Sequence, residues 1–209
     1  MKLAGPPPKG QKWDREQALE GLGRLGTPAA WQAILKIALG EGKTAATRAA
    51  GSSHEALRAY AILLLGEKGD EAFLTPLLGM LPQAPESLRG EILRTLGFFH
   101  APRANQVLFD RLHSRDVNDR VNAILGLRNL ENKNSIPALI AMLDDPSSEV
   151  RQVADFALRQ LTGKAVTRSP QASVAEAEPA GRRAGEWQAW WRENGGKLVV
   201  TAQPPCRDW

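Results

Sequence analysis

The pattern of apolar positions along this chain repeats on two scales. Three, seven and ten residues after each of five arginines, the chain carries mostly small or apolar residues, and these offsets lie on one face of an α-helix. The last four arginines are 31 residues apart, and the first precedes the second by 43, which equals one period and a 12-residue insertion. The five are Arg15, Arg58, Arg89, Arg120 and Arg151. Each unit is therefore predicted to begin with an amphipathic helix of about four turns.

A second apolar stripe follows nineteen, twenty and twenty-three residues after the arginines, as at Leu108, Phe109 and Leu112. Short turns with glycine, proline or asparagine separate it from the first helix, so each unit reads as a helical hairpin. A fixed period of this size is typical of a solenoid, in which one hairpin is repeated. The predicted fold is all-α, a right-handed α-solenoid of about five helical hairpins.

Two local expectations concern the ends of helices. Lys68 interrupts the apolar column ten residues after the arginine, so the first helix of the second unit is expected to fray or bend outward at its end. Asp70 and Ser135 are available as caps for the second helices that follow them, because short polar side chains accept hydrogen bonds from free backbone N–H groups.

Three stretches share a motif, and the clearest runs Asp119-Arg120-x-x-Ala123-x-x-x-Leu127-x-x-Leu130. With related stretches at 57–70 and 150–161, residues 14–163 resemble the HEAT-like repeat family over about three quarters of the chain. The resemblance implies binding scaffolding rather than a particular reaction, and it implies that the second helices line the concave side. The closing stretch from Leu161 to Asn194 resembles the end of many bacterial HEAT-repeat modules, where a tryptophan helix completes the last hairpin.

One elongated domain is predicted, with less regular segments around it. Residues 41–52 form an insertion, which in a repeat array maps to a loop on one face, either functional or merely tolerated. The stretch 164–183 has almost no large apolar residue and cannot offset its ordering entropy by burial. The predicted segments are a flexible linker (1–12), the solenoid (13–163), a mobile polar loop (164–183), a tryptophan capping helix (184–195) and a C-terminal tail (196–209).

The charge distribution argues against a nucleic-acid groove, which needs clustered positive charge. The 209 residues carry a formal net charge of +4, but residues 41–164 hold 15 basic and 15 acidic groups. The excess therefore lies mainly in residues 1–40. One cysteine, Cys206, excludes an internal disulfide.

The location of the protein is predicted from what its sequence lacks. No apolar run approaches the roughly 20 residues that a membrane helix needs. Residues 1–12 lack the apolar core of a secretory signal. The expected location is the cytoplasm, unless the chain is a segment of a longer, exported protein.

The arginine column has two interpretations. The arginines could bind an anion, but their place on the core-facing side of each first helix favours buried stems and guanidinium groups that bridge neighbouring units. Acidic residues such as Asp119 and Asp145 are close at hand. A structural role is also expected for Trp187, Trp190 and Trp191, which share one helix face and would close the last hairpin. Their alternative role is a ligand cage or a platform for nucleobases.

The second-helix surface is the predicted binding face. Its positions off the buried stripe are small, mixed and weakly charged, which suits a protein or peptide partner better than phosphate. The alternative is an ordinary solvated helix face. The predicted partner-binding residues are Gln32, Lys36, Thr75, Gln106, Asp110, Arg111 and Met142.

Sequence signals of an enzyme are absent. His54, His100 and His113 show no metal-ligand spacing, and no phosphate loop, nucleophile elbow or cysteine cluster occurs. No catalytic residue, metal or cofactor is therefore predicted. The predicted function is a non-catalytic scaffold that binds a partner protein or peptide along the concave second-helix face. The alternatives left open are a HEAT-like-repeat enzyme or nucleic-acid-binding protein (DNA glycosylase-like or bilin lyase-related), and a purely architectural part of a larger assembly.

Overall fold

The structure, a computed structural model, describes residues 15–41, 51–163 and 182–200. Within these ranges it consists of ten α-helices and five 3-10 turns, without a strand. The helices are α1 (Arg15–Leu25), α2 (Pro28–Leu39), α4 (Gly51–Lys68), α5 (Leu74–Met80), α6 (Glu86–Leu96), α7 (Pro102–Arg111), α8 (Val117–Asn129), α9 (Ile136–Ala141), α10 (Ser148–Thr162) and α11 (Arg182–Asn194). The 3-10 turns are η1 (Glu71–Phe73), η2 (Leu81–Gln83), η3 (Gly97–Phe99), η4 (Lys133–Ser135) and η5 (Met142–Asp144).

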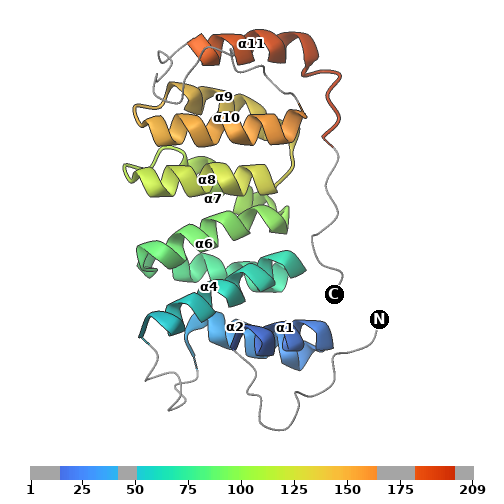
Figure 1. Cartoon of the computed structure of the whole chain (residues 1–209). Coiled ribbons are helices and arrows are strands. Elements are labelled where there is room, and N and C mark those ends of the chain that lie inside the picture. Colours follow the sequence, from blue (N-terminus) through green and yellow to red (C-terminus); the bar gives the residue numbers. More distant parts are fainter. Residues whose placement is uncertain (1–14, 42–50, 164–181, 201–209) are drawn as a thin grey trace.

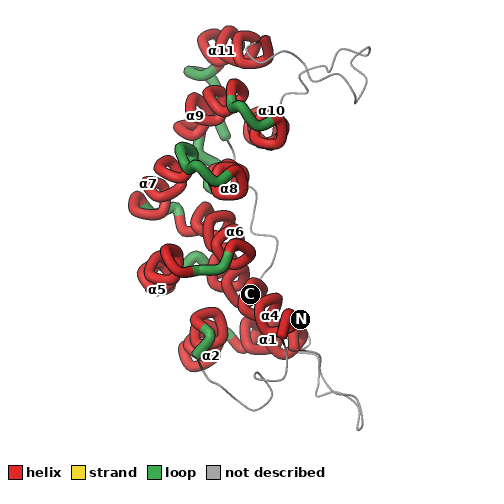
Figure 2. The backbone as a smooth tube through the Cα atoms, turned by 90° about the vertical axis from the view of Figure 1, so that its left-hand side faces the viewer, coloured by secondary structure: helices red, strands yellow, loops and turns green. Residues whose placement is uncertain are grey.

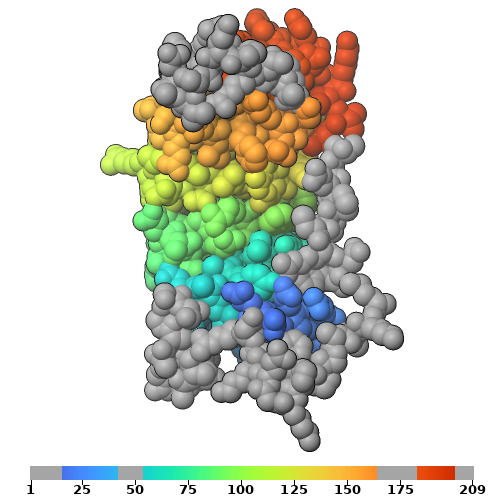
Figure 3. Space-filling view, viewed as in Figure 1, coloured from blue at the N-terminus to red at the C-terminus, as the bar shows by residue number. Residues whose placement is uncertain are grey.

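The helices form five hairpins that stack along one axis (Figure 1). Each hairpin has a first helix (α1, α4, α6, α8 or α10) and a second helix (α2, α5, α7, α9 or α11). In the space-filling view the hairpins follow one another as successive layers, in the order of the sequence (Figure 3). The prediction of an all-α solenoid built of helical hairpins is confirmed.

Short polar residues and glycines set the ends of several helices. The Thr27 hydroxyl accepts a hydrogen bond from the Ala30 N–H at 3.2 Å, and Pro28 follows as the first helical residue of α2. At the other end Gly40 has φ of 74°, the left-handed conformation in which its N–H can reach the last carbonyls of α2. The sequence therefore specifies both ends of this helix locally.

The two expectations about helix ends are wrong in part. Helix α4 stays helical up to its last residue, Lys68, whose ammonium lies 5.7 Å from the centre of the Trp31 ring in a cation–π contact. Asp70 does cap η1, but Ser135 is fully buried and caps nothing. Asn132 takes that place and accepts from the Asn134 N–H at 2.9 Å.

The predicted apolar columns form the core in the first helices of the second to fifth hairpins and in the second helices of the first to fourth hairpins. In the first helices the residues three after the arginine have no exposed surface, and the same holds for the residues nineteen after it in the second helices. The first set is Ala61, Ile92, Ala123 and Ala154, and the second is Ile34, Leu77, Leu108 and Leu139. Burial of these columns is continuous from α2 to α10, so the stack has one shared core.

Helix α1, the first helix of the first hairpin, departs from the predicted columns. Ala18 is exposed, and Leu25 has 59% of its surface accessible, whereas Leu19 is buried at 2%. The reason is that α1 has a described neighbour on one side only. The helix face that meets the preceding hairpin in the other units stays open here.

Glycines allow the first helices to approach one another closely. A Cβ atom on Gly97 would lie 2.0 Å from the carbonyl oxygen of Gly126, and one on Gly126 would lie 2.5 Å from the carbonyl oxygen of Leu93. Helices α6 and α8 therefore meet backbone against backbone at these points. No larger residue fits there without moving a helix.

The spacing of the helices decides how the stack bends. Helix α4 packs on α6, α6 on α8 and α8 on α10, whereas α5, α7 and α9 make few contacts with one another. Figure 2 shows the second helices bowed outward at α5 and α7, with the first helices on the inner side. The prediction that the second helices line the concave side is therefore wrong for the described stack, because the row with the closer spacing lies inside a bend.

We expect Gly126→Ala to lower the free energy of unfolding by about 1–3 kcal/mol, because the added methyl group meets backbone atoms on α6. The matched control is Gly79→Ala on α5, where nothing lies within 4 Å of the new Cβ. Alanine is the better helix former there, so stability should stay the same or rise by up to about 1 kcal/mol. Urea unfolding of both variants measures the difference, and equal stabilities would contradict the close packing.

Candidate interaction surfaces

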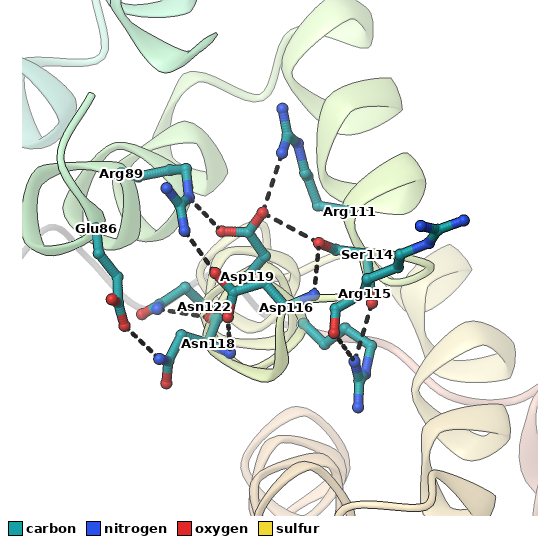
Figure 4. Close-up of polar contacts among 10 residues, drawn as sticks. Glu86, Arg89, Arg111, Ser114, Arg115, Asp116, Asn118, Asp119 and Asn122 are labelled. Carbon is teal, nitrogen blue, oxygen red and sulfur yellow. Dashed lines mark hydrogen bonds and ion pairs between the residues drawn. The ribbon is translucent and has the colours of Figure 1, made fainter. Parts of the chain in front are cut away.

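Two arginines of the column bind carboxylates of the next hairpin. Arg89 on α6 donates from Nε to Asp119 at 2.6 Å and from Nη2 to Asp116 at 2.5 Å (Figure 4). Arg120 on α8 forms a bidentate pair with Asp145, with distances of 2.8 and 2.9 Å. These pairs join α6 to α8 and α8 to the turn before α10.

Two further arginines of the column bind backbone carbonyls. Arg58 Nε donates to the Ala38 carbonyl at the end of α2, at 3.1 Å. Arg151 Nη1 donates to the carbonyls of Asp145 and Pro146, at 2.7 and 3.0 Å. The side chain of Arg15 lies outside the described residues. The structural role of the column stays a prediction, which these contacts favour over anion binding.

Asp119 is the centre of the polar cluster in Figure 4. It is 4% exposed and also accepts hydrogen bonds from Arg111 at 3.0 Å and from Ser114 at 3.1 Å. Burial would raise the pKa of Asp119, but the hydrogen bond and charge of Arg89, with the bonds from Ser114 and Arg111, outweigh burial and hold the pKa below its usual value. The pKa of Arg89 is raised, chiefly by its hydrogen bond to Asp119 and against the effect of burial. The pair is therefore ionised at neutral pH, and the Asp119 carboxylate carries no proton that it could give to a substrate.

Asp155 on α10 holds the C-terminal helix and was not singled out from the sequence. It is 7% exposed and accepts from Arg159 at 2.9 Å, from Arg183 at 2.7 Å and from the Trp187 indole N–H at 3.1 Å. A signal for it exists, because Asp155 stands four residues after its arginine, where the other units have leucine or isoleucine. A charged residue in an apolar column indicates a buried ionic contact.

The three tryptophans of α11 turn toward the stack. Trp187 is 1% exposed and meets Trp190 edge to face, with ring centres 5.5 Å apart. Trp190 and Trp191 are half-buried and pack against the core, and α11 contacts α9 as the second helix of the last hairpin. The predicted role of these residues in closing the stack fits this placement and stays a prediction.

The predicted partner-binding residues of the second helices are not brought together. Gln106 donates to Asp110 at 2.7 Å on α7, and Arg111 turns inward to Asp119. Met142 is half-buried against the core. The other three, all exposed, are distributed over α2 and α5: Gln32, Lys36 and Thr75. Because the second helices are spread apart, these side chains form no continuous patch.

The solvent-facing side of the first helices carries a column that the sequence analysis missed. Leu63, Arg94, Leu125 and Phe156 stand 31 residues apart on α4, α6, α8 and α10. Phe156 has 46% of its surface exposed, and both leucines are half-buried. The same 31-residue period that located the core also marks this column, five residues after each arginine. We call this surface the first-helix face.

A shallow polar groove of about 630 Å³ lies between α6 and α8 on the first-helix face. It is lined by Glu86, Ser87, Gly90, Arg94, Asn118 and Asn122. Asn118 donates to Glu86, and Arg94 donates to the Asn122 amide oxygen at 2.7 Å. Ser87 donates to Glu55 on α4, which repeats the Asn118–Glu86 contact one unit earlier. The groove side chains thus link successive units to one another.

Among the described residues, no group of three or more histidine, cysteine, aspartate or glutamate side chains is placed to hold a metal ion. No helix within the described ranges has the length and apolar character needed to span a membrane. The predicted linker 1–12 and Cys206 lie outside the described residues, as do most of the predicted insertion and of the loop 164–183.

Comparison with known proteins gives two family matches. The model of the HEAT repeat matches residues 136–164, and that of the PBS lyase HEAT-like repeat matches residues 119–145. Together they run from the first turn of α8 to the end of α10. No curated protein matches the chain. The matched stretch includes Arg120, Asp145 and Arg151, which join the fourth hairpin to the fifth.

We expect Arg120→Ala to lower the free energy of unfolding by about 3 kcal/mol, because Asp145 would be left as a buried carboxylate with its ion pair removed. The matched control is Arg24→Ala, which removes a pair at 3.4 Å with a largely exposed arginine and should cost less than about 0.5 kcal/mol. Urea unfolding and melting temperature measure both. An Arg120→Ala protein as stable as the wild type would speak against the structural role of the column.

The lowered pKa of Asp119 predicts an acid-sensitive contribution to stability. The contribution is complete above the ordinary aspartate pKa of about 3.9 and is lost as the pH falls from there through the lower pKa of the folded state. Asp119→Asn lacks this titration, so the stability difference from the wild type should narrow below about pH 4. Urea unfolding at a series of pH values measures it. A difference that stays constant or widens on acidification would refute the assignment.

Proposed function

This chain is built of HEAT-like repeats, and we propose that it is a non-catalytic module that binds a partner protein on its first-helix face. HEAT repeats generally serve as scaffolds for protein interaction, and the family is typically non-catalytic. The observation that supports this surface is the column of Leu63, Leu125 and Phe156, which leaves apolar side chains partly exposed on three first helices. Aromatic and aliphatic side chains on a firm support are typical of protein interfaces.

The close packing of the first helices also favours the first-helix face as a binding surface. The first helices meet at glycine contacts such as Gly97 with Gly126, and ion pairs such as Arg120 with Asp145 join their ends. A surface that is already ordered loses little conformational entropy when a partner binds. The face therefore combines exposed apolar area with preorganisation.

The second-helix face is the weaker candidate. It lies on the outer side of the bend, and its exposed side chains are polar and separated. The Gln106–Asp110 and Arg111–Asp119 contacts occupy three of the seven predicted residues. These positions serve best as the comparison in a test of the proposal.

A protein partner is favoured over nucleic acid by the charge on the same face. Glu55, Glu67, Glu86 and Glu91 stand on α4 and α6, where carboxylates would repel a phosphate backbone. The buried carboxylates Asp119 and Asp155 are held by arginines, which suits structure better than acid–base chemistry.

Site-specific photo-crosslinking in the host cell tests the proposed function. A photoreactive phenylalanine analogue is placed at Gln152 or Phe156 on α10, and in matched variants at Thr75 or Gln106 on the second helices. We expect one discrete protein to be crosslinked from the two positions on α10 and not from the other two. Products from Thr75 and Gln106 alone would move the binding surface to the other face. Recovery of nucleic acid, or of no discrete product at any position, would contradict the proposed function.

A further inference from the structure

Arg128, at the C-terminal end of α8, is an arginine without a carboxylate partner in the described part of the chain. Its Nε and Nη2 groups both donate to the amide oxygen of the neighbouring Asn129, at 3.2 and 2.8 Å. By contrast, Arg94 pairs with Glu91 and Arg159 with Asp155. Asn129 in turn donates to the Arg94 carbonyl at 3.0 Å, so the guanidinium of Arg128 is held in place by a neutral group.

Phe156 on the next first helix completes the surroundings of this arginine. The guanidinium carbon lies 5.9 Å from the centre of the Phe156 ring, within cation–π range. Half-buried apolar side chains flank the pair, with Leu125 one turn before Arg128 on α8 and Val153 one turn before Phe156 on α10. Phe156 itself remains 46% exposed. We call these four residues, in which Arg128 contacts Phe156 and the two aliphatic side chains stand one turn away on the same helices, the Arg128 patch.

The charge of Arg128 is partly removed from water, and no carboxylate of the described residues compensates it. Burial lowers the pKa of Arg128, but a guanidinium remains protonated under ordinary conditions. Partial desolvation of an unpaired charge is unfavourable, and an anionic group that reaches it recovers that free energy. Both hydrogen bonds to Asn129 come from Nε and Nη2, so the Nη1 group of Arg128 has no hydrogen bond among the described residues. A carboxylate is a suitable acceptor for this group.

We propose that the Arg128 patch binds an acidic segment of a partner protein, with a carboxylate on the Arg128 guanidinium and an adjacent apolar side chain on Phe156 and Leu125. The proposal rests on the proposed function and names the partner chemistry at one end of the first-helix face. The charge complementarity is local, because Glu55, Glu67, Glu86 and Glu91 stand on α4 and α6, and Glu149, at the start of α10, stands two turns before Phe156. An acidic segment is therefore directed to the α8–α10 end.

Selection from a phage-displayed library of random peptides, with the full chain as target, tests the proposal. We expect wild-type protein to enrich peptides in which aspartate or glutamate stands next to a large apolar residue. The Arg128→Gln variant should not enrich them. Enrichment of peptides without acidic residues, or no enrichment of any peptide, would overturn the proposal.

The best acidic peptide and its amide analogue, with glutamine or asparagine in place of each acid, are then compared by fluorescence polarisation. We expect Arg128→Gln and Phe156→Ala each to weaken the acidic peptide about tenfold or more, and the amide analogue to bind wild type comparably weakly. Arg24→Gln, an exposed arginine on α1, should leave the affinity unchanged, and unfolding curves confirm that each variant is folded. Equal binding of the two peptides, undiminished binding by folded Arg128→Gln, or stronger competition by a single-stranded oligonucleotide than by the peptide would refute the proposal. The photo-crosslinking experiment separates the two proposals. If a protein is crosslinked from Phe156 but one of these refuting results is found, the proposed function stands and the acidic partner chemistry is rejected.

Discussion

Buried carboxylates that bind arginines of a neighbouring segment are the contacts on which the register of the stack depends. Asp119, Asp145 and Asp155 are 4%, 8% and 7% exposed. Asp119 and Asp145 join successive hairpins, whereas Asp155 joins the two helices of the fifth hairpin. Apolar packing is non-directional and tolerates sliding of one helix along another. Sliding would break a buried ion pair, and this is costly because it leaves an unpaired charge away from water. The leucine columns supply the core. We expect the Arg89–Asp119 and Arg120–Asp145 ion pairs to fix how the third, fourth and fifth hairpins sit on one another.

The fold was predictable from the sequence because its information is periodic. Ile92 and Leu108 belong to columns that repeat, and the repeat alone predicts two packed helices per unit. Ala18 and Leu25 belong to the same columns, yet they are exposed, because burial depends on neighbours that only the assembled stack supplies. The direction of the bend was out of reach for a related reason. It follows from the spacing of helices at contacts such as Gly97 with Gly126, which exist only when two units meet.

For the candidate site, the sequence predicted the class of partner, which stays a prediction, and it did not predict the first-helix face. The sequence favoured a protein partner, and the apolar side chains of the first-helix face support that choice. The residues named for it were wrongly placed on a concave surface, because that assignment came from the family resemblance and not from this chain. Phe156 was visible as part of the 31-residue period, but its exposure was not. Arg128 gave no signal in the sequence, since the lack of a carboxylate partner among the described residues is recognised only when the neighbours of the arginine are known.

The glycine contacts of the first helices and the loose row of second helices give the two edges of the stack unequal stiffness. Backbone meets backbone where α6 and the turn after it pack on α8, and ion pairs join α6 to α8 and α8 to the turn before α10. The helices α5, α7 and α9 make few contacts with one another, so fewer contacts oppose a change in their spacing. A force applied across the ends of the stack is therefore expected to change its curvature by altering the spacing of the second helices more than that of the first helices. A partner bound to the first-helix face would then meet little change in the spacing of the helices that it contacts.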